Sequence, residues 1–468
     1  MTSSECEKND KKTKVLNWLK APIRADVLNI AWPVLVELLL GSLFGMIDMM
    51  MLGRISDKPL AAASVAAVGM TNQPLFIGIS LVQALNVGGT AMVARYFGSN
   101  QKDKIETTLK HVMLLSLFML AIPLSILGII FTDSILNFMR AEADALQAGR
   151  VCFKVVMIGF MFQSLNMSMS AALRGIGETK TPMKINLKAN GLNVIGNALL
   201  IYGLIGFPKL GVTGAGISTT LSNIVASVML FRYVIKGKSV VKLNLRNRFK
   251  FDKDIIFNLI KIGLPASLEQ LVLRTGVLLF VKIVAGLGTV VYASHQIALN
   301  ILGLSFQPGQ AFGISASSLV GRSLGAHELS KAEAYAKETR KIGSMISTFM
   351  AIIFFFFGPQ LVGLYSNDPA IIENASLALK IIALVQPFQS SQFILAGGLR
   401  GAGDTFWPLV GTFTGVLLVR VGLAYVFVKV LGYGLAGAWM AVFVDQFVRW
   451  LFVYARFKTG HWKYTKLR

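Results

Sequence analysis

The stretch Leu173-Arg174-Gly175-Ile176-Gly177-Glu178-Thr179 returns later in the chain as Leu399-Arg400-Gly401-Ala402-Gly403-Asp404-Thr405, at an offset of about 226 residues. Similar positions recur well outside this segment. They are Phe162-Gln163-Ser164 with Phe388-Gln389-Ser390, Gln83 with Gln310, Arg95 with Arg322, Gly98 with Gly325, Pro33 with Pro265, and Glu37 with Glu269. In a strongly apolar chain, a repeat of this length predicts two like halves that transport a solute at their interface. A duplicated scaffold without transport is the alternative.

The composition indicates a membrane protein. Of 468 residues 54% are hydrophobic and 15% charged, and the mean hydropathy is +0.62, which is too apolar for an ordinary soluble protein. We predict an all-α integral membrane protein with twelve transmembrane helices, arranged as two six-helix lobes related by a parallel internal repeat. The predicted helices span residues 28–52, 61–92, 111–131, 152–173, 185–206, 213–235, 256–285, 288–318, 342–364, 376–398, 408–431 and 434–456.

The net charge of +23 reports topology. If the N-terminus is cytoplasmic, most of the 46 Lys and Arg residues fall in cytoplasmic tails and loops. We therefore expect a plasma or bacterial inner membrane protein with both termini in the cytoplasm, in contact with membrane lipids and without a nucleic-acid partner. The predicted organisation is a cytoplasmic tail 1–25, an N-terminal lobe 26–236, a basic cytoplasmic linker 237–253, a C-terminal lobe 254–457 and a cytoplasmic tail 458–468.

Several classes of function lack a sequence signal. The first 25 residues are polar and Lys-rich, so we expect no cleavable signal peptide. Cys6 and Cys152 offer no disulfide framework, and the four histidines have no metal-ligand spacing, so we expect no metal centre and no organic cofactor. No paired Asp, His cluster or Ser–His arrangement favours a membrane-embedded enzyme, and no feature favours a sensor that does not transport.

Two acids lie within the first predicted helix. Asp48 is about twenty residues from its start, where a carboxylate costs at least ~2.5 kcal/mol on insertion scales and should face a cavity or a partner. Glu37 lies on the same face, about 16 Å away along the axis. Gly41 and Gly45 between them permit close helix approach. Asp48 is either functional or paired with a neighbouring helix, and Glu37 is equally open to both roles.

The fifth predicted helix carries four amides on one face, at Asn186, Asn190, Asn193 and Asn197. An amide offers both a carbonyl oxygen for a cation and an NH2 donor. We favour an ion or substrate role for Asn193 and Asn197, and hydrogen bonding between helices as the alternative. Asn186 and Asn190 are weaker candidates because Lys184 and Lys188 flank them.

The second half repeats this pattern only in part. Glu269 mirrors Glu37, with lobe packing as an equal alternative to function. Asp445 and Arg449 are four residues apart in the twelfth predicted helix, and we interpret them as a self-neutralising structural pair. Lys282 and Arg420 also fall inside predicted helices, and the pattern leaves open whether they snorkel or line a cavity.

Gln83 and Gln310 occupy matching places, and Gln310 follows Pro308. Because Pro in a helix interior frees backbone groups, we expect the helices at 61–92 and 288–318 to line the central path. The Leu-Arg-Gly segments are predicted to end the fourth and tenth helices, as hinge elements or as plain tight turns.

Together these residues resemble the multidrug and toxic compound extrusion (MATE) family over nearly the whole chain. The resemblance is strongest at Ile47-Asp48 with Gly53, at Ala293–Asn300, and at the two Leu-Arg-Gly segments. It implies two six-helix lobes around a V-shaped central cavity and export of small organic cations, including drugs, in exchange for Na⁺ or H⁺.

Carried over by position, the family's coupling site corresponds to Asp48, Asn193, Asn197 and Thr219. Na⁺ is a candidate ligand of the first three. The chain departs from two branch patterns, because Asn197 stands where a proton-coupled branch has Asp, and Leu273 and Gln389 stand where another branch has Glu and Asp. Both Na⁺ and H⁺ therefore stay open as the coupling ion. The candidate substrate-cavity residues are Glu37, Gln83, Glu269, Gln310 and Gln389.

The sequence thus predicts a monomeric antiporter that works by alternating access, with Asp48 as the switch. The closest rival is a related flippase for a lipid-linked saccharide. Such a protein should need a strongly cationic cavity for a diphosphate, whereas acids and amides mark the predicted site here.

Overall fold

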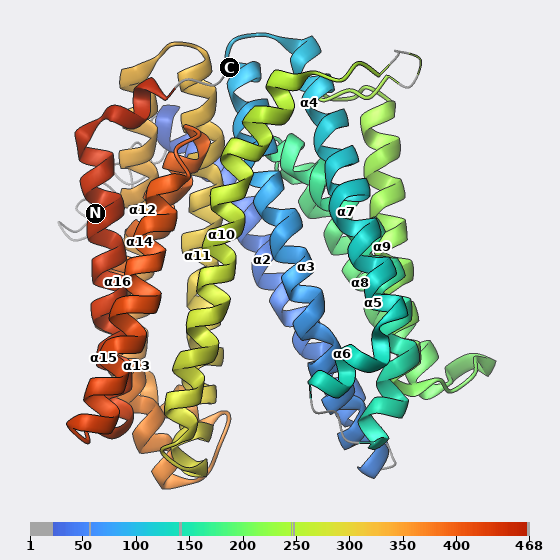
Figure 1. Ribbon diagram of the computed structural model, residues 1–468, viewed down its shortest axis with the longest axis vertical. Helices are drawn as coiled ribbons and strands as arrows, with labels where there is room; N and C mark the ends of the chain where they lie inside the picture. Colours follow the sequence, from blue (N-terminus) through green and yellow to red (C-terminus); the bar gives the residue numbers. More distant parts are fainter. Residues whose placement is uncertain (1–21, 56–57, 140–142, 245, 247–248, 466–468) are drawn as a thin grey trace, which may run out of the picture.

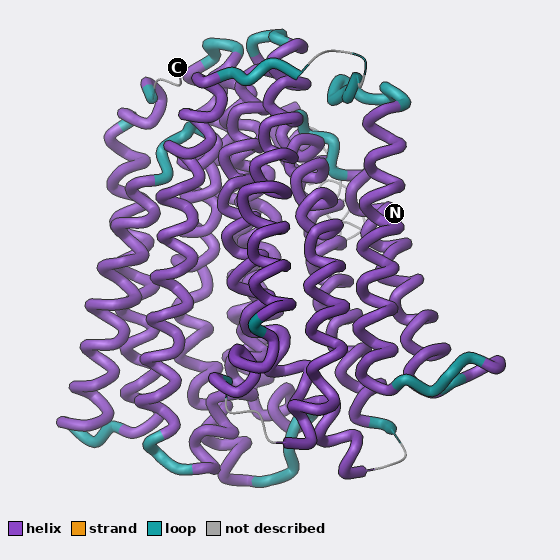
Figure 2. Tube along the Cα trace, turned by 45° about the vertical axis from the view of Figure 1, so that its right-hand side comes forward, coloured by secondary structure: helices purple, strands orange, loops and turns teal. Residues whose placement is uncertain are grey.

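The computed structural model describes residues 22–55, 58–139, 143–244, 246 and 249–465, and within them helices dominate and no strand occurs (Figure 2). The first lobe has six long helical runs. They are α2 (Pro22–Gly53), α3 (Lys58–Gly98), the continuous run of α4 (Lys102–Leu114), η1 (Leu115–Ala121) and α5 (Ile122–Ile130), then α7 (Ala143–Gly175), α8 (Lys180–Tyr202) and α9 (Gly211–Ile235).

The second lobe also has six long runs. They are α10 (Lys253–Ala285), α11 (Thr289–Gly325), α12 (Leu329–Gly363), α13 (Pro369–Gly401), the run of α14 (Phe406–Thr412), η3 (Phe413–Arg420), α15 (Val421–Tyr425) and η4 (Val426–Val430), and α16 (Gly434–Thr459). Three short helices complete the described chain: α6 (Thr132–Phe138), η2 (Leu204–Gly206) and η5 (His461–Tyr464).

The predicted all-helical fold class, with twelve long helices in two lobes, is confirmed. Several helices are longer than predicted, such as α3 beyond 61–92 and α12 beyond 342–364. Hydropathy marks only the apolar part of a helix, whereas backbone hydrogen bonding continues into the polar turns at its ends.

Nine of the described helices are long and apolar enough to span a membrane, and α8, α10 and α11 are not among them. These three carry many of the polar residues considered above, including Asn193, Asn197, Glu269 and Gln310. A low mean hydropathy marks these three helices as polar, whereas α2 and α16 carry buried or half-buried charges and are still apolar enough to be among the nine.

The two lobes meet at one end of the molecule and diverge toward the other (Figure 1). The end that carries residues 236–252 is called the linker end below, and the opposite end the distal end. At the linker end α3 and α11 pack backbone against backbone. A Cβ atom on Gly98 would lie 1.9 Å from the carbonyl oxygen of Arg322, and one on Gly325 would lie 2.0 Å from that of Arg95. The internal repeat thus forms a reciprocal contact between the lobes.

Helix α2 belongs to both lobes. Its first half packs against the second lobe, where Val27 and Ile30 share a core cluster with Phe312 of α11. Its second half packs in the first lobe, where Leu52 joins a cluster that includes Ile201 of α8. The first helix therefore connects the interior of one lobe with the linker end of the other.

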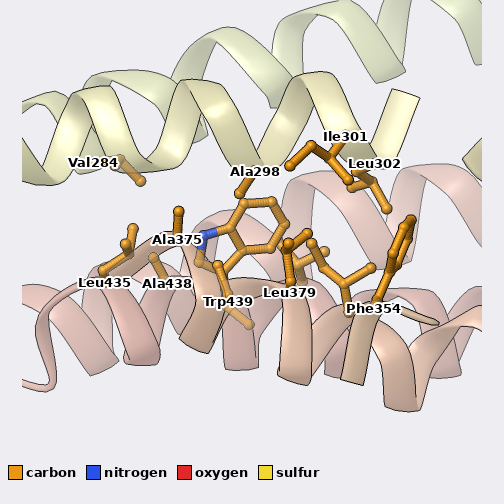
Figure 3. Packing of buried hydrophobic residues seen from close by; sticks show 14 of the residues in the cluster. Val284, Ala298, Ile301, Leu302, Phe354, Ala375, Leu379, Leu435, Ala438 and Trp439 are labelled. Atoms are coloured by element: carbon orange, nitrogen blue, oxygen red, sulfur yellow. The ribbon is translucent and has the colours of Figure 1, made fainter. Parts of the chain in front are cut away.

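Helix capping and a buried hydrophobic core stabilise the second lobe. The side chain of Asp252 accepts hydrogen bonds from backbone N–H groups in the first turn of α10, and Asp368 does the same for α13. Inside the lobe, Trp439 of α16 packs among small and branched side chains such as Ala298 and Leu379 (Figure 3). This tight core holds the helices of the second lobe in fixed positions relative to one another.

Candidate functional site

The four residues predicted for a coupling site come together around Asp48. The Asn197 Nδ2 of α8 donates to Asp48 Oδ1 at 2.7 Å, and Asn193, one turn away, faces the same carboxylate. Thr219 of α9 lies behind Asn193, within hydrogen-bond distance of its amide. Asp48 is half-buried, whereas Asn193 and Asn197 are buried. Three helices of the first lobe thus converge on one acid.

Only one of the two orientations of the Asn193 amide satisfies its polar neighbours around a bare carboxylate. In one orientation its Nδ2 donates to both Asp48 carboxylate oxygens at 3.0 Å, and its oxygen accepts from the Thr219 N–H and hydroxyl at 3.1 Å. In the other, Nδ2 donates to Thr219 Oγ1 at 3.1 Å and the amide oxygen faces the carboxylate. The first orientation suits a bare carboxylate, and the second suits one that holds a cation or a proton.

Close packing of α8 on α9 aligns these amides. A Cβ atom on Gly196 would lie 2.4 Å from Ser218 Oγ, so only glycine lets the two helices approach this far. Ser218 in turn donates to the Asn193 backbone carbonyl at 2.8 Å. Gly196 therefore sets the distance of Asn193 and Asn197 from α9 and from Asp48.

The donor set suits a hard cation or a proton. Asp48 supplies two carboxylate oxygens, and the buried Asn197 Oδ1 has no hydrogen-bond partner among the described residues. Oxygen atoms of carboxylates, amides and hydroxyls are the ligands that hard cations prefer. In the described part of the chain no three His, Cys, Asp or Glu groups gather into a metal site, so one carboxylate would carry the charge.

Glu37 and Glu269, proposed above as cavity residues, each form an ion pair within helices of the bundle. Arg174 Nη2 donates to Glu37 at 2.7 Å, and Asn186 Nδ2 donates to the same oxygen at 2.6 Å. In the second lobe Arg400 Nη2 donates to both Glu269 oxygens, at 2.7 and 2.8 Å. Both acids and the Arg residues of the Leu-Arg-Gly segments recur in the repeat, but their pairing could not be predicted because the partners are far apart in sequence.

The two ion pairs differ in burial, which gives a testable ranking. The Glu269 side chain is 3% exposed and the Glu37 side chain 11%. Arg400→Ala leaves a buried carboxylate with only the Thr412 hydroxyl, and loss of one partner of a buried pair costs about 3–5 kcal/mol. Arg174→Ala leaves Glu37 with Asn186. We expect Arg400→Ala to lower the melting temperature of the purified protein more than Arg174→Ala does, and the reverse order would contradict this account.

Each Leu-Arg-Gly segment also contains an acid, Glu178 or Asp404, which bonds to the end of a neighbouring helix. Glu178 accepts from Ser239 at 2.5 Å and from the Tyr233 hydroxyl, and Asp404 accepts from Arg456 at 2.7 Å. Gly177 and Gly403 have φ of +86° and +85°, so both segments end in the same left-handed turn. This geometry accounts for the repeat of the segment as a helix-ending turn with two anchoring charges.

Asp445, the buried acid of α16, has two basic partners. Asp445 bonds Arg449 on its own helix, at 3.0 Å, and also Arg420 of η3, at 2.5 and 2.8 Å. The predicted self-neutralising pair is therefore part of a triad with one excess positive charge. Arg420, for which the sequence left open snorkelling or lining a cavity, instead pairs with an acid of another helix.

The three glutamines proposed for a substrate cavity lie in different surroundings. Gln83 is exposed on α3, and Gln310 is half-buried on α11. Gln389 is 1% exposed and faces a void of about 10 Å³, which it shares with Gln446 and Trp439. Neither amide atom of Gln389 has a partner among the described residues, and a void of this size holds about one water. The structure does not bring the three together.

Of the four acids in the apolar parts of the helices, only Asp48 has no Lys or Arg partner among the described residues. Glu37, Glu269 and Asp445 each bind at least one Arg. Because no basic side chain offsets its charge, a cation or proton should bind more favourably at Asp48 than at the three paired acids.

Comparison with known proteins agrees with this architecture. The family model described as MatE matches residues 33–199 and 265–426. The "Probable multidrug resistance protein NorM" of Thermotoga maritima is 30% identical over 94% of this chain and 93% of its own length. The "Uncharacterized transporter YisQ" of Bacillus subtilis is 29% identical over 93% and 94%.

Solved structures share the fold. One described as "Crystal structure of MATE in complex with MaL6" superposes with a TM-score of 0.87 at 24% identity, covering 96% of this chain and 98% of that one. Another, described as an outward-facing conformation of a multidrug resistance MATE family transporter of the MOP superfamily, has a TM-score of 0.86 at 24% identity with the same coverage.

Proposed function

Because the chain belongs to the MATE family, and is therefore a multi-pass membrane transporter and not an enzyme, we propose that it exports small organic cations, drugs among them, in exchange for Na⁺ or H⁺. The name of the Thermotoga maritima relative supports drugs as substrates. We propose a monomer in the plasma or inner membrane with both termini in the cytoplasm, in line with the distribution of Lys and Arg.

The observation that carries the antiport proposal is the unpaired carboxylate of Asp48. A Na⁺ ion or a proton would cancel its charge, and the Asn193 amide would turn its oxygen toward the site. An ion shifts a conformational equilibrium only by its differential affinity for the two states. Asp48, the two amides and Thr219 lie on three helices, so a change in the spacing of these helices alters that affinity.

The arrangement of the lobes supports alternating access. They are in contact at the linker end and diverge toward the distal end (Figure 1). If the linker end is cytoplasmic, this state is open to the outside, as a solved structure of similar fold is described to be. Helix α2 contains Asp48 and also contacts α11 near the linker end. Ion binding in the first lobe would therefore shift the equilibrium between the closed and the open linker end.

The proposal is tested by efflux of a fluorescent lipophilic cation from proteoliposomes, with a Na⁺ gradient and a proton gradient imposed separately. We expect one gradient to drive transport and the other to have no effect, which would identify the coupling ion. A gradient of K⁺ serves as the control, since it gives a similar ionic imbalance without either candidate ion.

Transport of the dye under neither gradient, by protein that is folded and correctly inserted, would contradict the antiport proposal. It would turn attention to the flippase alternative, for which accumulation of a lipid-linked saccharide in cells lacking the protein is the measurement. Family membership and fold would be unaffected by that result.

A further inference from the structure

The second lobe carries a groove at its linker end, with a volume of about 880 Å³, in the range of sites that enclose a ligand. Helix α13 forms the floor and packs against both walls, α12 and α16. In Figure 1 α16 lies at the edge of the molecule, away from the first lobe. The segment after α16 closes the groove at the linker end, where Lys463 bonds Glu333 of α12.

The linker end of the groove is basic. Five Lys or Arg residues line it, and its two acids are already paired, Glu333 with Lys337 and Lys463, and Glu338 with Arg24. Five basic and two acidic side chains leave an excess of positive charge. The basic residues are Lys337, Arg340, Lys341, Lys458 and Lys463.

Two of these cations face the groove without an acid. Arg340 of α12 lies 5.4 Å from the ring centre of Tyr454, and Lys458 of α16 lies 5.4 Å from the same ring. Neither forms an ion pair among the described residues. Contact with the same tyrosine ring keeps both cations near Tyr454 but leaves their charges uncompensated, so an anion that reaches both side chains would be stabilised by each.

Away from the linker end the groove becomes apolar. On α12 the lining passes from Lys337 through Met345 and Phe349 to Ile352, a rise of about 22 Å. Met345, Phe349 and Ile352 are at least half exposed. On α16 Trp450 continues the apolar lining, stacked on Tyr454 with ring centres 5.0 Å apart. The length exceeds half of a hydrocarbon core, which is about 15 Å.

We propose that this groove binds an anionic phospholipid of the adjacent leaflet, with its headgroup phosphate between Arg340 and Lys458 and an acyl chain along Phe349, Ile352 and Trp450. The order of charge and apolar surface along α12 matches that of a lipid from its headgroup inward. Basic pockets between membrane helices at the interface are suited to acidic headgroups. A zwitterionic lipid would fit the apolar part equally well but gain less at the basic end.

Quenching of Trp450 fluorescence by brominated lipids tests the proposal directly. The full-length protein is placed in mixed micelles with dibromo-phosphatidylglycerol or dibromo-phosphatidylcholine, and the signal of Trp450→Phe is subtracted to isolate the groove tryptophan from the other five of the six. We expect phosphatidylglycerol to quench at far lower mole fractions. In Arg340→Ala/Lys458→Ala this preference should fall roughly 30-fold, because each basic residue contributes about fivefold at an anionic surface.

The matched control is Lys236→Ala/Lys238→Ala, which removes two exposed lysines at the linker end of the first lobe. It should leave the preference unchanged. Equal quenching by the two lipids in the wild type, or an equal loss of preference in both double variants, would overturn the proposal. Effective competition by soluble glycerol 3-phosphate would also overturn it, since the site would then bind a free phosphate. Native mass spectrometry of wild-type protein, counting each bound lipid, gives a readout that needs no variant.

Discussion

Asp48→Asn should strongly reduce ion-driven export while leaving the protein folded. The substitution keeps the size of the side chain and its hydrogen bonds to the amides of α8, but removes the one charge that an incoming ion offsets. Coupling free energies between sites are about 1–3 kcal/mol, so gradient-driven accumulation should fall roughly 5- to 150-fold. Efflux from proteoliposomes under the effective gradient, together with binding of radioactive Na⁺ or a proton-uptake measurement, checks both the transport and the ion site.

Glu37→Gln is the matched control for this experiment. It removes a carboxylate from the same helix, but one that is paired with Arg174 and bonded by Asn186. We expect it to lower thermal stability and to retain dependence on the ion gradient. If Asp48→Asn transported at the wild-type rate under the same gradient, Asp48 could not be the switch, whatever its contacts.

Gly98→Val is expected to prevent closure of the linker end. The added Cβ would stand 1.9 Å from a backbone carbonyl oxygen of α11, and a backbone atom cannot move aside as a side chain does. Overpacking costs about 1–3 kcal/mol, which is enough to shift a two-state equilibrium roughly 5- to 150-fold toward the state with this end open. Transport should fall accordingly, because one of the two states becomes inaccessible.

A cysteine at the lobe contact reports this change. Ser318 is buried at the linker end, where its hydroxyl donates to the Gly175 carbonyl across the lobes at 3.0 Å. In a Cys6→Ser background, Ser318→Cys should resist a hydrophilic maleimide and become reactive when combined with Gly98→Val. Gly303→Val is the control, because a Cβ on Gly303 of α11 meets nothing within 4 Å. Protection that persisted in the Gly98→Val protein would refute the closure argument.

Local patterns in the sequence predicted the helices and the single polar residues, and the resemblance to a family predicted that Asp48, Asn193 and Asn197 form one cluster. Runs of apolar residues set the number of helices, and the spacing of Asn193 and Asn197 fixed their common face. The resemblance to a family pointed to Thr219, and the structure brings all four residues together. Whether they bind the coupling ion stays a prediction.

The partners of the buried charges could not be predicted in the same way. Glu269 and Arg400 are far apart in sequence, and so are Asp445 and Arg420, so only the packing of helices shows that they meet. Spacing suggested Arg449 for Asp445 because i, i+4 neighbours on a helix are always close. Gln83, Gln310 and Gln389 were grouped by repeat position and family alignment, but each faces a different environment.

The shared membership of α2 in both lobes has a consequence for biosynthesis. Val27 and Ile30 leave the ribosome first, but Phe312, against which they pack, follows only about 280 residues later. At typical rates of synthesis this delay is roughly 15–60 s. During that time only first-lobe contacts, such as the hydrogen bond from the Thr179 hydroxyl to the Ile30 carbonyl, are available to the first half of α2. The packing of the first helix is therefore completed only after the second lobe has been synthesised.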